Sequence, residues 1–310
     1  FNDFLSINKI FKNKLDYVMS SISGFEGLEP TIKIIKYTKS IAIANKEAII
    51  CGWNIINKEL KINKTDFIPV DSEHFSIHYA LKNNSFSNIE KVFLTASGGP
   101  LKNLPLKKFK YIKISQALKH PNWQMGEKIS IDSATMMNKV FEIIEAKKIF
   151  NIKYNKLEIL VHPKSYIHAI VKYNDGMIKI VAHETNMKIP IFNTLYNEDN
   201  KFLTTKKLDI NKLNNLNFTK VDLKKFPLIK ILSKLSNQDS LFETIIVSAN
   251  DELVQLFLSN KIKFTDISNI LIKFLNFPEF SKYKYIQAKK IETIVKLNKY
   301  VRFKINNISV

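Results

Sequence analysis

Along the first hundred residues, short apolar runs alternate with segments in which apolar positions recur every three or four residues. The apolar runs predict four strands, at residues 15–22, 40–44, 66–70 and 91–96. The periodic segments predict two helices, one over 27–37 with Pro30 in its first turn and one from Lys46 to about Glu59. Strands that alternate with helices are typical of a parallel sheet with helices on its faces.

Residues 132–144 predict a helix with almost no solvated face. Most of its positions are apolar, namely Met136, Met137, Val140, Phe141, Ile143 and Ile144. Its polar residues Asn138, Lys139 and Glu142 are three or four positions apart and therefore share one stripe. Because burying unpaired charges costs several kcal/mol, the stripe indicates either a structural ion pair or a site for a metal or a charged ligand.

Beyond residue 150 the pattern changes twice. Residues 157–161 and 177–181 predict strands, with Asn174-Asp175-Gly176 as a turn. A polar, Lys- and Asn-rich stretch follows, and apolar stripes with helical spacing return from Phe226 onward. We therefore expect four parts: an α/β part at 1–70, a second part at 71–196 that becomes β-rich, a linker at 197–222 and a helical domain at 223–310.

Composition narrows the class of protein. The chain has 310 residues, and the 45% that are hydrophobic are enough for a large core. It has no apolar run long enough to cross a membrane and opens without a signal-peptide pattern. Its single cysteine, Cys51, excludes an internal disulfide and fits a reducing cytosol.

The formal net charge of +20 raises the possibility of nucleic-acid binding. Arg302 is the only arginine, however, and proteins that read bases or clamp phosphates usually use the arginine fork. The lysines are also scattered along every segment. We interpret them as a solvated, lysine-rich surface and keep a lysine-rich nucleic-acid-binding protein as an alternative.

Three polar clusters directly follow the second, third and fourth predicted strands: Asn45-Lys46-Glu47, Asp71-Ser72-Glu73 and Ser97-Gly98-Gly99. Ligands bind beyond the carboxyl ends of strands in open parallel sheets, so we expect the clusters to meet at one site. In extended backbone Asp71 and Glu73 point to the same side. Together with Glu142 they form a candidate site for Mg²⁺ or Mn²⁺, although a surface turn is the alternative for the acidic pair.

Two loops complete the candidate site. Ser97-Gly98-Gly99-Pro100 offers backbone N–H groups to an anion, or is simply a tight turn. Residues 120–126 predict a mobile lid. His120 is the first residue of this segment and is the histidine that we expect in the site. Among the other histidines, His74 and His78 are four residues apart and are expected as a pair on a helix surface, with a metal-binding pair as the alternative. We expect His162 and His168 in strand packing, and His183 has no partner in the sequence.

Several motifs then match one family in order and spacing. They are Ala44-Asn-Lys-Glu-Ala48, Pro69-Val-Asp-Ser-Glu-His74, Leu94-Thr-Ala-Ser-Gly-Gly-Pro100, His120-Pro-Asn-Trp-Gln-Met-Gly126, Ile131-Asp-Ser-Ala-Thr-Met-Met-Asn-Lys139, Val161-His-Pro-Lys-Ser-Tyr-Ile-His168 and Glu184-Thr-Asn-Met187. Across essentially its whole length the chain resembles 1-deoxy-D-xylulose 5-phosphate reductoisomerase.

The resemblance implies an enzyme that isomerises and reduces 1-deoxy-D-xylulose 5-phosphate to 2-C-methyl-D-erythritol 4-phosphate, in the non-mevalonate route to isoprenoids. It implies NADPH and Mn²⁺ or Mg²⁺ as cofactors, and a cytoplasmic, bacterial-type homodimer. The implied fold is α/β: the C-terminal part of a Rossmann-like parallel-sheet NADPH domain (the nucleotide-binding part, 1–70), an α+β catalytic domain with a lid loop that binds metal and substrate (71–196), and a C-terminal α-helical domain (223–310).

The resemblance also implies roles for single residues. The implied metal ligands are Asp71, Glu73 and Glu142. The implied substrate contacts are Lys46, Ser72, Glu73, Ser97, His120, Ser133, Asn138, Lys139 and Glu142, and those implied in catalysis are Lys46, Glu73, His120 and Glu142. Residues implied at NADPH are Asn45, Glu47, Gly126 and Met187, with Met187 and Trp123 packed around the nicotinamide and the substrate.

The chain departs from the family pattern in three places. Val140 stands where the family usually has Gly, and residues 183–187 lack the usual Gly and Pro. The glycine-rich βαβ half of the nucleotide domain, roughly 80 residues, is absent from the sequence, which begins at Phe1. We interpret the chain as a fragment of an active enzyme; the alternative is an inactive remnant that binds only phosphosugar and metal.

Overall fold

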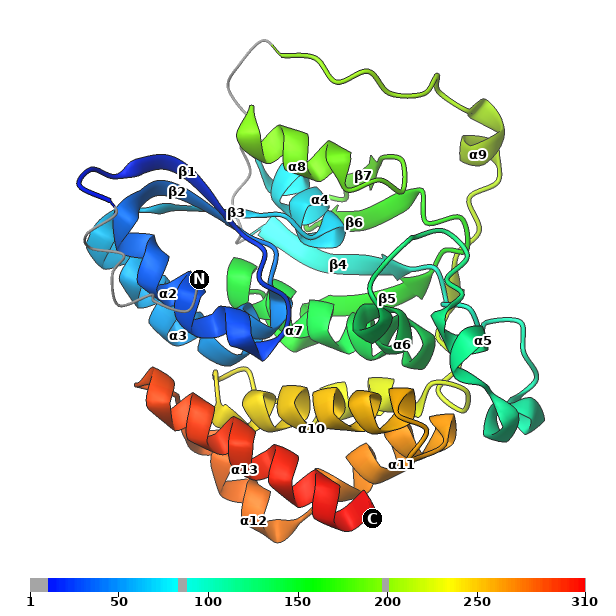
Figure 1. The fold of residues 1–310 in the computed structure, drawn as a ribbon. Coiled ribbons are helices and arrows are strands. Elements are labelled where there is room, and N and C mark those ends of the chain that lie inside the picture. Colours follow the sequence, from blue (N-terminus) through cyan, green and yellow to red (C-terminus); the bar gives the residue numbers. More distant parts are fainter. Residues whose placement is uncertain (1–10, 83–87, 197–200, 310) are drawn as a thin grey trace.

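The computed structural model describes residues 11–82, 88–196 and 201–309 (Figure 1). The first ten residues of the expected nucleotide-binding part, and residues 197–200 of the expected linker, lie outside the described residues. Within the described residues no helix is both long and apolar enough to cross a membrane.

The first sheet confirms the parallel alternation predicted for the N-terminal part. Its three parallel strands, in spatial order, are β1 (Leu15–Ser20), β2 (Thr38–Ile43) and β3 (Asp66–Pro69). They are connected by α2 (Leu28–Ile34), which short 3₁₀ turns extend at both ends, and by α3 (Lys46–Asn63). Helices in the connections are what parallel strands require, because the chain must return to the same end of the sheet.

The second sheet is mixed. Its strands, in spatial order, are β7 (Ile178–Ala182), β6 (Ile167–Tyr173), β4 (Ile89–Ala96), β5 (Leu157–Val161) and β8 (Thr219–Lys220). Strand β4 is parallel to β5 and antiparallel to β6. The prediction of β4 as a fourth strand of the parallel series is therefore wrong. Its partners follow it in the chain by more than 60 residues, and local alternation carries no signal for such distant pairing.

Two helices cross the middle of the molecule, where the sequence pattern predicted one. They are α6 (Glu127–Thr135) and α7 (Met137–Phe150), separated by Met136 in a left-handed conformation with φ of 64°. Nearly all of α7 is buried, as predicted. Its side chains enter both hydrophobic clusters of the protein: Val140 and Phe141 belong to one, and Ile143 and Phe150 to the other. Helix α7 therefore packs between the two hydrophobic clusters and contributes side chains to both.

The C-terminal residues form helices, as their spacing predicted. These are a 3₁₀ segment (Pro227–Lys234), α10 (Leu241–Leu258), α11 (Phe264–Phe274), α12 (Pro278–Ser281) and α13 (Ile291–Ser309). They make a layer beneath α3, α6 and α7 (Figure 1), and α10 contacts both α3 and α6. Before them, α8 (Lys188–Leu195) leads into a long connection whose described residues include α9 (Ile210–Asn214) and β8. The other short elements are α4 (Ser72–Leu81) and α5 (Ile114–Leu118).

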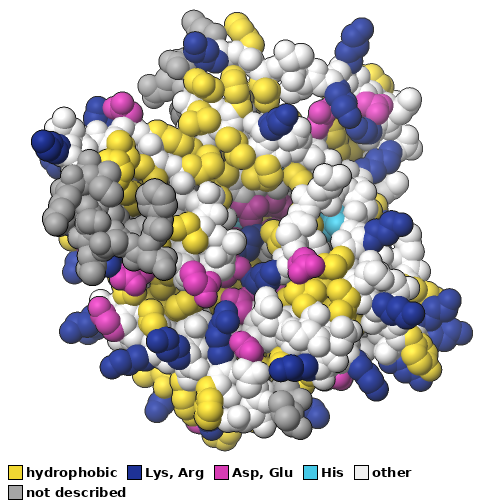
Figure 2. Space-filling model, viewed as in Figure 1, with side chains coloured by type: hydrophobic (Ala, Val, Ile, Leu, Met, Phe, Trp, Pro, Cys, Tyr) yellow, Lys and Arg dark blue, Asp and Glu magenta, His cyan; other side chains and the backbone are white. Residues whose placement is uncertain are grey.

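The surface is hollowed between these layers. Figure 2 shows acidic side chains and lysines together at the floor of a hollow in the middle of one face, while other lysines are spread around the outline of the molecule. Charged groups that gather inside a concavity call for a separate explanation from the solvated lysines outside it.

Candidate active site

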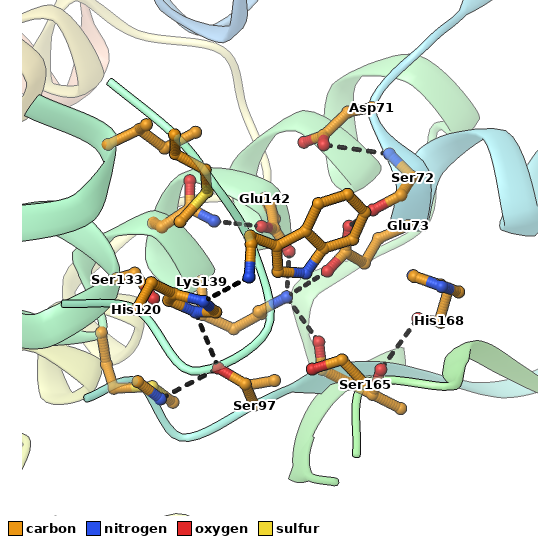
Figure 3. Close-up of a pocket in the computed structure, with 18 of the residues that line it drawn as sticks. Asp71, Ser72, Glu73, Ser97, His120, Ser133, Lys139, Glu142, Ser165 and His168 are labelled. Carbon is orange, nitrogen blue, oxygen red and sulfur yellow. Dashed lines mark hydrogen bonds and ion pairs between the residues drawn. The ribbon is translucent and has the colours of Figure 1, made fainter. Parts of the chain in front are cut away.

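The hollow contains a cavity of about 240 Å³, here called the first cavity. It lies where the segments after β2, β3 and β4 meet the lid segment and the α6–α7 junction (Figure 3). The predicted site residues that line it are Lys46, Asp71, Ser72, Glu73, Ser97, His120, Trp123, Ser133, Asn138, Lys139, Glu142 and Met187. The expectation that the three strand-end clusters meet is therefore confirmed for Lys46, Asp71-Ser72-Glu73 and Ser97-Gly98-Gly99, although the strands belong to two sheets.

Three carboxylates converge at one side of this cavity. Asp71, Glu73 and Glu142 each offer an oxygen, and these oxygens all lie within 4.8 Å of one another. The extended geometry expected for the first two is wrong, because Asp71 is the N-cap of α4 and accepts a hydrogen bond from the Ser72 backbone N–H at 3.0 Å, so that Glu73 lies in the first helical turn. Capping and the positive end of the helix dipole both favour acidic side chains there.

Two buried lysines hold these carboxylates in place. The Lys46 ammonium lies 3.1 Å from Asp71 Oδ2 and donates to Asn138 Oδ1 at 2.7 Å. The Lys139 ammonium donates to Glu73 Oε1 at 2.7 Å, to the Thr95 carbonyl oxygen at 2.5 Å, and to Glu142 Oε2. Asn138 in turn donates to Glu142 Oε1 at 2.5 Å. The polar stripe predicted on α7 thus faces the acidic cluster as one connected network.

The carboxylates differ in how strongly they hold a proton. Burial, together with the Glu73 carboxylate, raises the pKa of Glu142 to about 7. Burial would also raise the pKa of Asp71, but Lys46 and His74 outweigh it and hold that pKa well below its ordinary value. Glu142 therefore holds its proton more tightly than an ordinary carboxyl group, because it is buried beside a second carboxylate.

The donor set fits a hard divalent cation. Oxygen ligands from three carboxylates are the kind that Mg²⁺ and Mn²⁺ prefer. With Glu145, whose carboxylate approaches the same cluster, four buried or half-buried carboxylates face the cations Lys46 and Lys139 and the imidazole of His74. A divalent ion among them would offset the remaining negative charge.

The opposite side of the cavity offers donors suited to an anion. Gly98 and Gly99 have φ of 84° and 67°, and a Cβ on Gly99 would lie 2.7 Å from the Ser133 carbonyl oxygen, so the loop requires glycine there. Ser97 Oγ accepts from the Gly99 backbone N–H at 3.0 Å and lies 3.1 Å from His120 Nε2. The hydroxyl of Ser133 faces the same space.

His120 presents a neutral donor to this side. Its Nδ1 accepts from the backbone N–H groups of Asn122 and Trp123, at 3.2 and 3.0 Å. The proton of the neutral ring is therefore on Nε2, which donates to Ser97 Oγ. Burial, with the nearby Lys139 charge, lowers the pKa of His120 to about 4, so the ring is uncharged near neutrality.

The lid segment is tied down at its centre. Asn122 Nδ2 donates to the Pro163 carbonyl oxygen and to Ser165 Oγ, both at 2.9 Å. The Trp123 ring meets the His168 ring edge-on at 6.2 Å, and His168 stacks on His183 at 3.7 Å. These contacts hold the lid over the cavity.

Sequence reasoning missed several lining residues. Thr95, Ser165 and His168 line the first cavity. They lie in the motifs at 94–100 and 161–168, but no site role was expected for Thr95 or Ser165, and His168 was expected only in strand packing. The surface assignment of His74 is wrong: its side chain is fully buried, whereas His78 is exposed. Spacing along a helix cannot tell which of two histidines faces the core.

A second cavity of about 560 Å³ adjoins the first and shares Ala44, Lys46 and Ile129 with it. Asn45, Glu47 and Gly126 line it, whereas Met187 lines the first cavity beside Trp123. The Asn45 side chain caps α3 by accepting from the Ala48 N–H at 2.6 Å, and it donates to the carbonyl oxygens of Gly24 (2.7 Å) and Ile22. Its amide is thus committed to the fold, and Glu47 is paired with Lys128.

Family models and curated relatives match this chain to the same family that its sequence motifs resemble. Family models described as 1-deoxy-D-xylulose 5-phosphate reductoisomerase, its C-terminal domain, and DXP reductoisomerase C-terminal domain match residues 5–52, 67–150 and 183–304. A 1-deoxy-D-xylulose 5-phosphate reductoisomerase of Pelagibacter ubique (strain HTCC1062) is 64% identical over 100% of this chain and 80% of its own length. One from Sulfurihydrogenibium sp. (strain YO3AOP1) is 41% identical over 86% of this chain and 70% of its own length.

Solved structures agree. A crystal structure of DOX-P reductoisomerase in complex with NADPH, fosmidomycin and magnesium has a TM-score of 0.88 at 31% identity, covering 95% of this chain and 76% of that one. The enzyme from Zymomonas mobilis in complex with NADPH has a TM-score of 0.82 at 32% identity, covering 95% and 75%. The chain therefore belongs to the 1-deoxy-D-xylulose 5-phosphate reductoisomerase family.

Proposed function

We propose that this chain isomerises and reduces 1-deoxy-D-xylulose 5-phosphate to 2-C-methyl-D-erythritol 4-phosphate, with NADPH and Mg²⁺ or Mn²⁺, as a step of non-mevalonate isoprenoid biosynthesis. The observation that carries the proposal is the convergence of Asp71, Glu73 and Glu142 in one cavity that also holds a glycine loop, serines and lysines. Relatives of the same family have been solved with NADPH and magnesium, which supports the choice of cofactors.

In this proposal Asp71, Glu73 and Glu142 hold the divalent cation. The cation supplies Lewis-acid polarisation of neighbouring substrate oxygens. Lys46, which contacts both Asp71 and Asn138, keeps the carboxylate side of the cavity oriented. Ser72 Oγ donates to Glu73 Oε2 at 2.5 Å and holds that ligand from the opposite direction.

The phosphate of the substrate is assigned to the opposite side of the cavity. Ser97 and Ser133 offer hydroxyl groups, and neutral His120 offers its Nε2–H. Asn138 and Lys139 line the same cavity and donate to the carboxylates in this structure, so we expect them to turn toward the phosphate when it binds. The phosphate is remote from the reacting carbons, so its binding energy serves to hold and orient the substrate. The lid, with Trp123 over the cavity, excludes water from the reacting atoms.

NADPH is assigned to the second cavity, with its nicotinamide directed at the first. Asn45, Glu47 and Gly126 line the second cavity, and Met187 and Trp123 face the first. With Asn45 committed to capping α3, we assign its contribution to shaping the wall rather than to a side-chain hydrogen bond. NADPH delivers the hydride, and the protein supplies its position.

We also propose a homodimer in the bacterial cytoplasm. The family resemblance supports both. Edge strand β7 supports the dimer, because it has no outer strand within the described residues and presents Ile178 and Ile180 to solvent. Exposed apolar side chains on an open strand edge favour pairing with another chain.

The decisive experiment follows NADPH consumption by the protein in its natural full length, with 1-deoxy-D-xylulose 5-phosphate and either Mg²⁺ or Mn²⁺. We expect turnover that is lost when the metal is chelated and restored when it is added back. An inactive remnant would bind the phosphosugar in calorimetry without consuming NADPH. A nucleic-acid-binding protein would instead be retained on DNA in a steeply salt-dependent way.

A further inference from the structure

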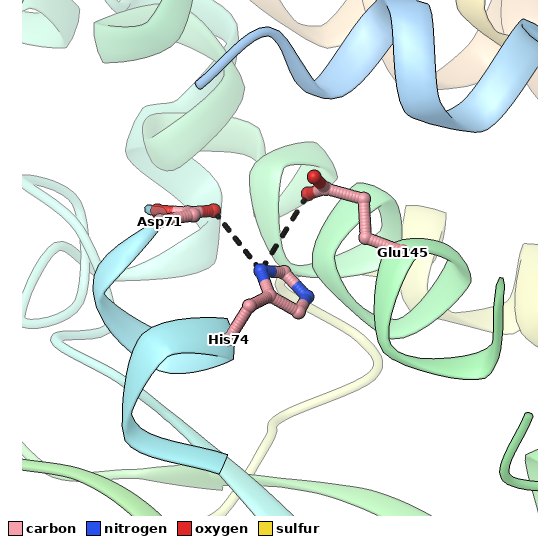
Figure 4. Close-up of side chains that lie close together, drawn as sticks. All are labelled: Asp71, His74 and Glu145. Carbon is pink, nitrogen blue, oxygen red and sulfur yellow. Dashed lines mark ion pairs between the residues drawn. The ribbon is translucent and has the colours of Figure 1, made fainter. Parts of the chain in front are cut away.

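Behind the three carboxylates, His74 and Glu145 form a buried pair of side chains that does not line the first cavity. His74, on α4, and Glu145, on α7, are both almost completely buried and are not among the described residues that line the first cavity (Figure 4). His74 Nδ1 lies 3.5 Å from Asp71 Oδ2 and 3.9 Å from Glu145 Oε2. Because burying two titratable side chains is costly, their position next to the metal-site carboxylates calls for an explanation.

The hydrogen-bond partners of His74 fix how its ring is turned. Its Nε2 lies 2.9 Å from the backbone carbonyl oxygen of Glu142, which can only accept, so Nε2 donates. This bond leaves Nδ1 directed at Asp71 and Glu145, as Figure 4 shows. The ring also stacks on Phe150 at 6.4 Å between centroids. His74 is thus held by three residues of α7 and in turn faces the N-cap of α4.

A second cation site does not fit this arrangement. Asp71, His74 and Glu145 offer ligand atoms within 4.8 Å of one another, but the Lys46 ammonium already lies 3.1 Å from the same Asp71 oxygen that faces His74. His74 and Glu145 are also closed off from the first cavity, whereas Asp71, Glu73 and Glu142 line it and are open to an incoming cation. His74 and Glu145 therefore act on the three carboxylates by orienting Asp71, which His74 contacts.

We propose that Glu145 and His74 are positioning residues that orient the Asp71 carboxylate and set the spacing between α4 and α7, and so determine the affinity of the site for a divalent cation. The inference rests on the proposed metal site. Residues that orient metal ligands from behind typically affect metal affinity by about 10- to 100-fold.

The test uses Mn²⁺ as the probe and the full-length protein without substrate. Free Mn²⁺ is followed by its electron paramagnetic resonance signal during titration, which yields a stoichiometry and a Kd independently of turnover. We expect Glu145→Gln and His74→Gln each to weaken Mn²⁺ binding by about 10- to 100-fold at unchanged stoichiometry. We expect the double variant to bind no more weakly than His74→Gln alone, because Glu145 acts through His74.

Glu243→Gln is the matched control. Glu243 is equally buried and pairs with Lys148, also on α7, so its loss removes a similar ion pair away from the metal site. Its Mn²⁺ affinity should equal that of the unmodified protein. If Glu145→Gln does not fold, Glu145→Asp, which keeps the charge but withdraws the carboxylate from His74, makes the same comparison.

Three outcomes would overturn the inference: unmodified Mn²⁺ affinity in both single variants, fully additive losses in the double variant, or a second bound Mn²⁺ that Glu145→Gln removes. Failure of the unmodified protein to bind Mn²⁺ is a separate result. It would reject the proposed metal site itself, together with everything that depends on it.

Discussion

At the scale of the residue, the site is determined by which buried charges have partners. Glu142 is almost fully buried and contacts Lys139 and Asn138, its neighbours on the same helix. Lys139 uses its donors on Glu73, Glu142 and the Thr95 carbonyl oxygen. Both residues also line the first cavity, so a substitution at either one changes the site itself.

Replacing Glu142 by Gln should reduce kcat by at least about 100-fold while the fold is kept, since it removes one preorganised charge but preserves size and the Asn138 contact. Turnover is measured by NADPH consumption, and folding by circular dichroism. Glu158→Gln, at a half-exposed carboxylate on β5, is the control and should be fully active. Normal activity of Glu142→Gln at ordinary metal concentrations would remove it from the ligand set.

Lys139→Ala should mainly weaken binding of the phosphate-bearing substrate. Loss of one charged hydrogen bond predicts a rise in KM of about 10- to 100-fold. Steady-state kinetics with varied substrate measure it, and Lys91→Ala, which breaks a partly exposed pair with Glu158, serves as the comparison. If KM and kcat of Lys139→Ala both stay at their original values, the phosphate role is wrong.

At the scale of the element, α7 joins the two halves of the core and is also anchored from below. Lys147 and Lys148 both contact Asp239 Oδ1, at 2.7 and 3.0 Å, and Lys148 donates to Glu243 on α10 at 2.6 Å. This ion network holds the helix that carries Glu142 against the C-terminal layer. Its contribution to folding should therefore depend on pH.

Burial would raise the pKa of Asp239, but Lys148 and Lys147 outweigh it and lower that pKa below its ordinary 3.8. A lowered pKa in the folded state adds stability that is present above the unfolded value and is lost as pH falls below it. Asp239→Asn should therefore lower the free energy of unfolding by about 2 kcal/mol at neutral pH.

The difference in the free energy of unfolding between Asp239→Asn and the unmodified protein should shrink as pH falls below 3.8, the ordinary pKa of an aspartate. Denaturant unfolding at a series of pH values measures it. Asp16→Asn, at a fully exposed pair with Lys39, should leave stability nearly unchanged and is the control. If Asp239→Asn lowers the free energy of unfolding by the same amount at every pH, the ion pairs of Asp239 are not the cause of the lost stability.

At the scale of the whole molecule, the two sheets meet around the first cavity, and β7 ends the second sheet with no outer strand among the residues that the structure describes. Strand β7 alternates exposed and half-buried residues, and its exposed side carries Ile178 and Ile180. Unlike the lysines scattered over the surface, these apolar side chains gain nothing from water. We therefore assign the proposed dimer contact to this strand.

Ile180→Glu should convert the dimer to a monomer, because it places a charge on the apolar edge. Light scattering after size-exclusion chromatography gives the mass directly. Ile62→Glu, at an equally exposed isoleucine on α3, should leave the mass unchanged. A dimer that survives Ile180→Glu at low protein concentration would move the interface elsewhere.

Much of this protein could be predicted from local pattern alone. Strands β1 to β3, the buried stripe of α7 and the C-terminal helices follow from periodicity, because each element must bury its own apolar face. The polar clusters at Lys46 and Asp71 could be assigned to one site, since chain direction in a parallel sheet puts strand ends together. Ser97 reaches the same site although β4 belongs to the other sheet, so that reason does not account for its place.

Other features depended on contacts between distant residues. The partners of β4, the burial of His74 beneath Asp71, and the break at Met136 that separates α6 from α7 have no local signal. The first two depend on what another segment presents at the same place: strands further along the chain, and the α7 carboxylates. The residue types of the site were thus readable from the chain, whereas the neighbours that orient them were decided only by tertiary packing.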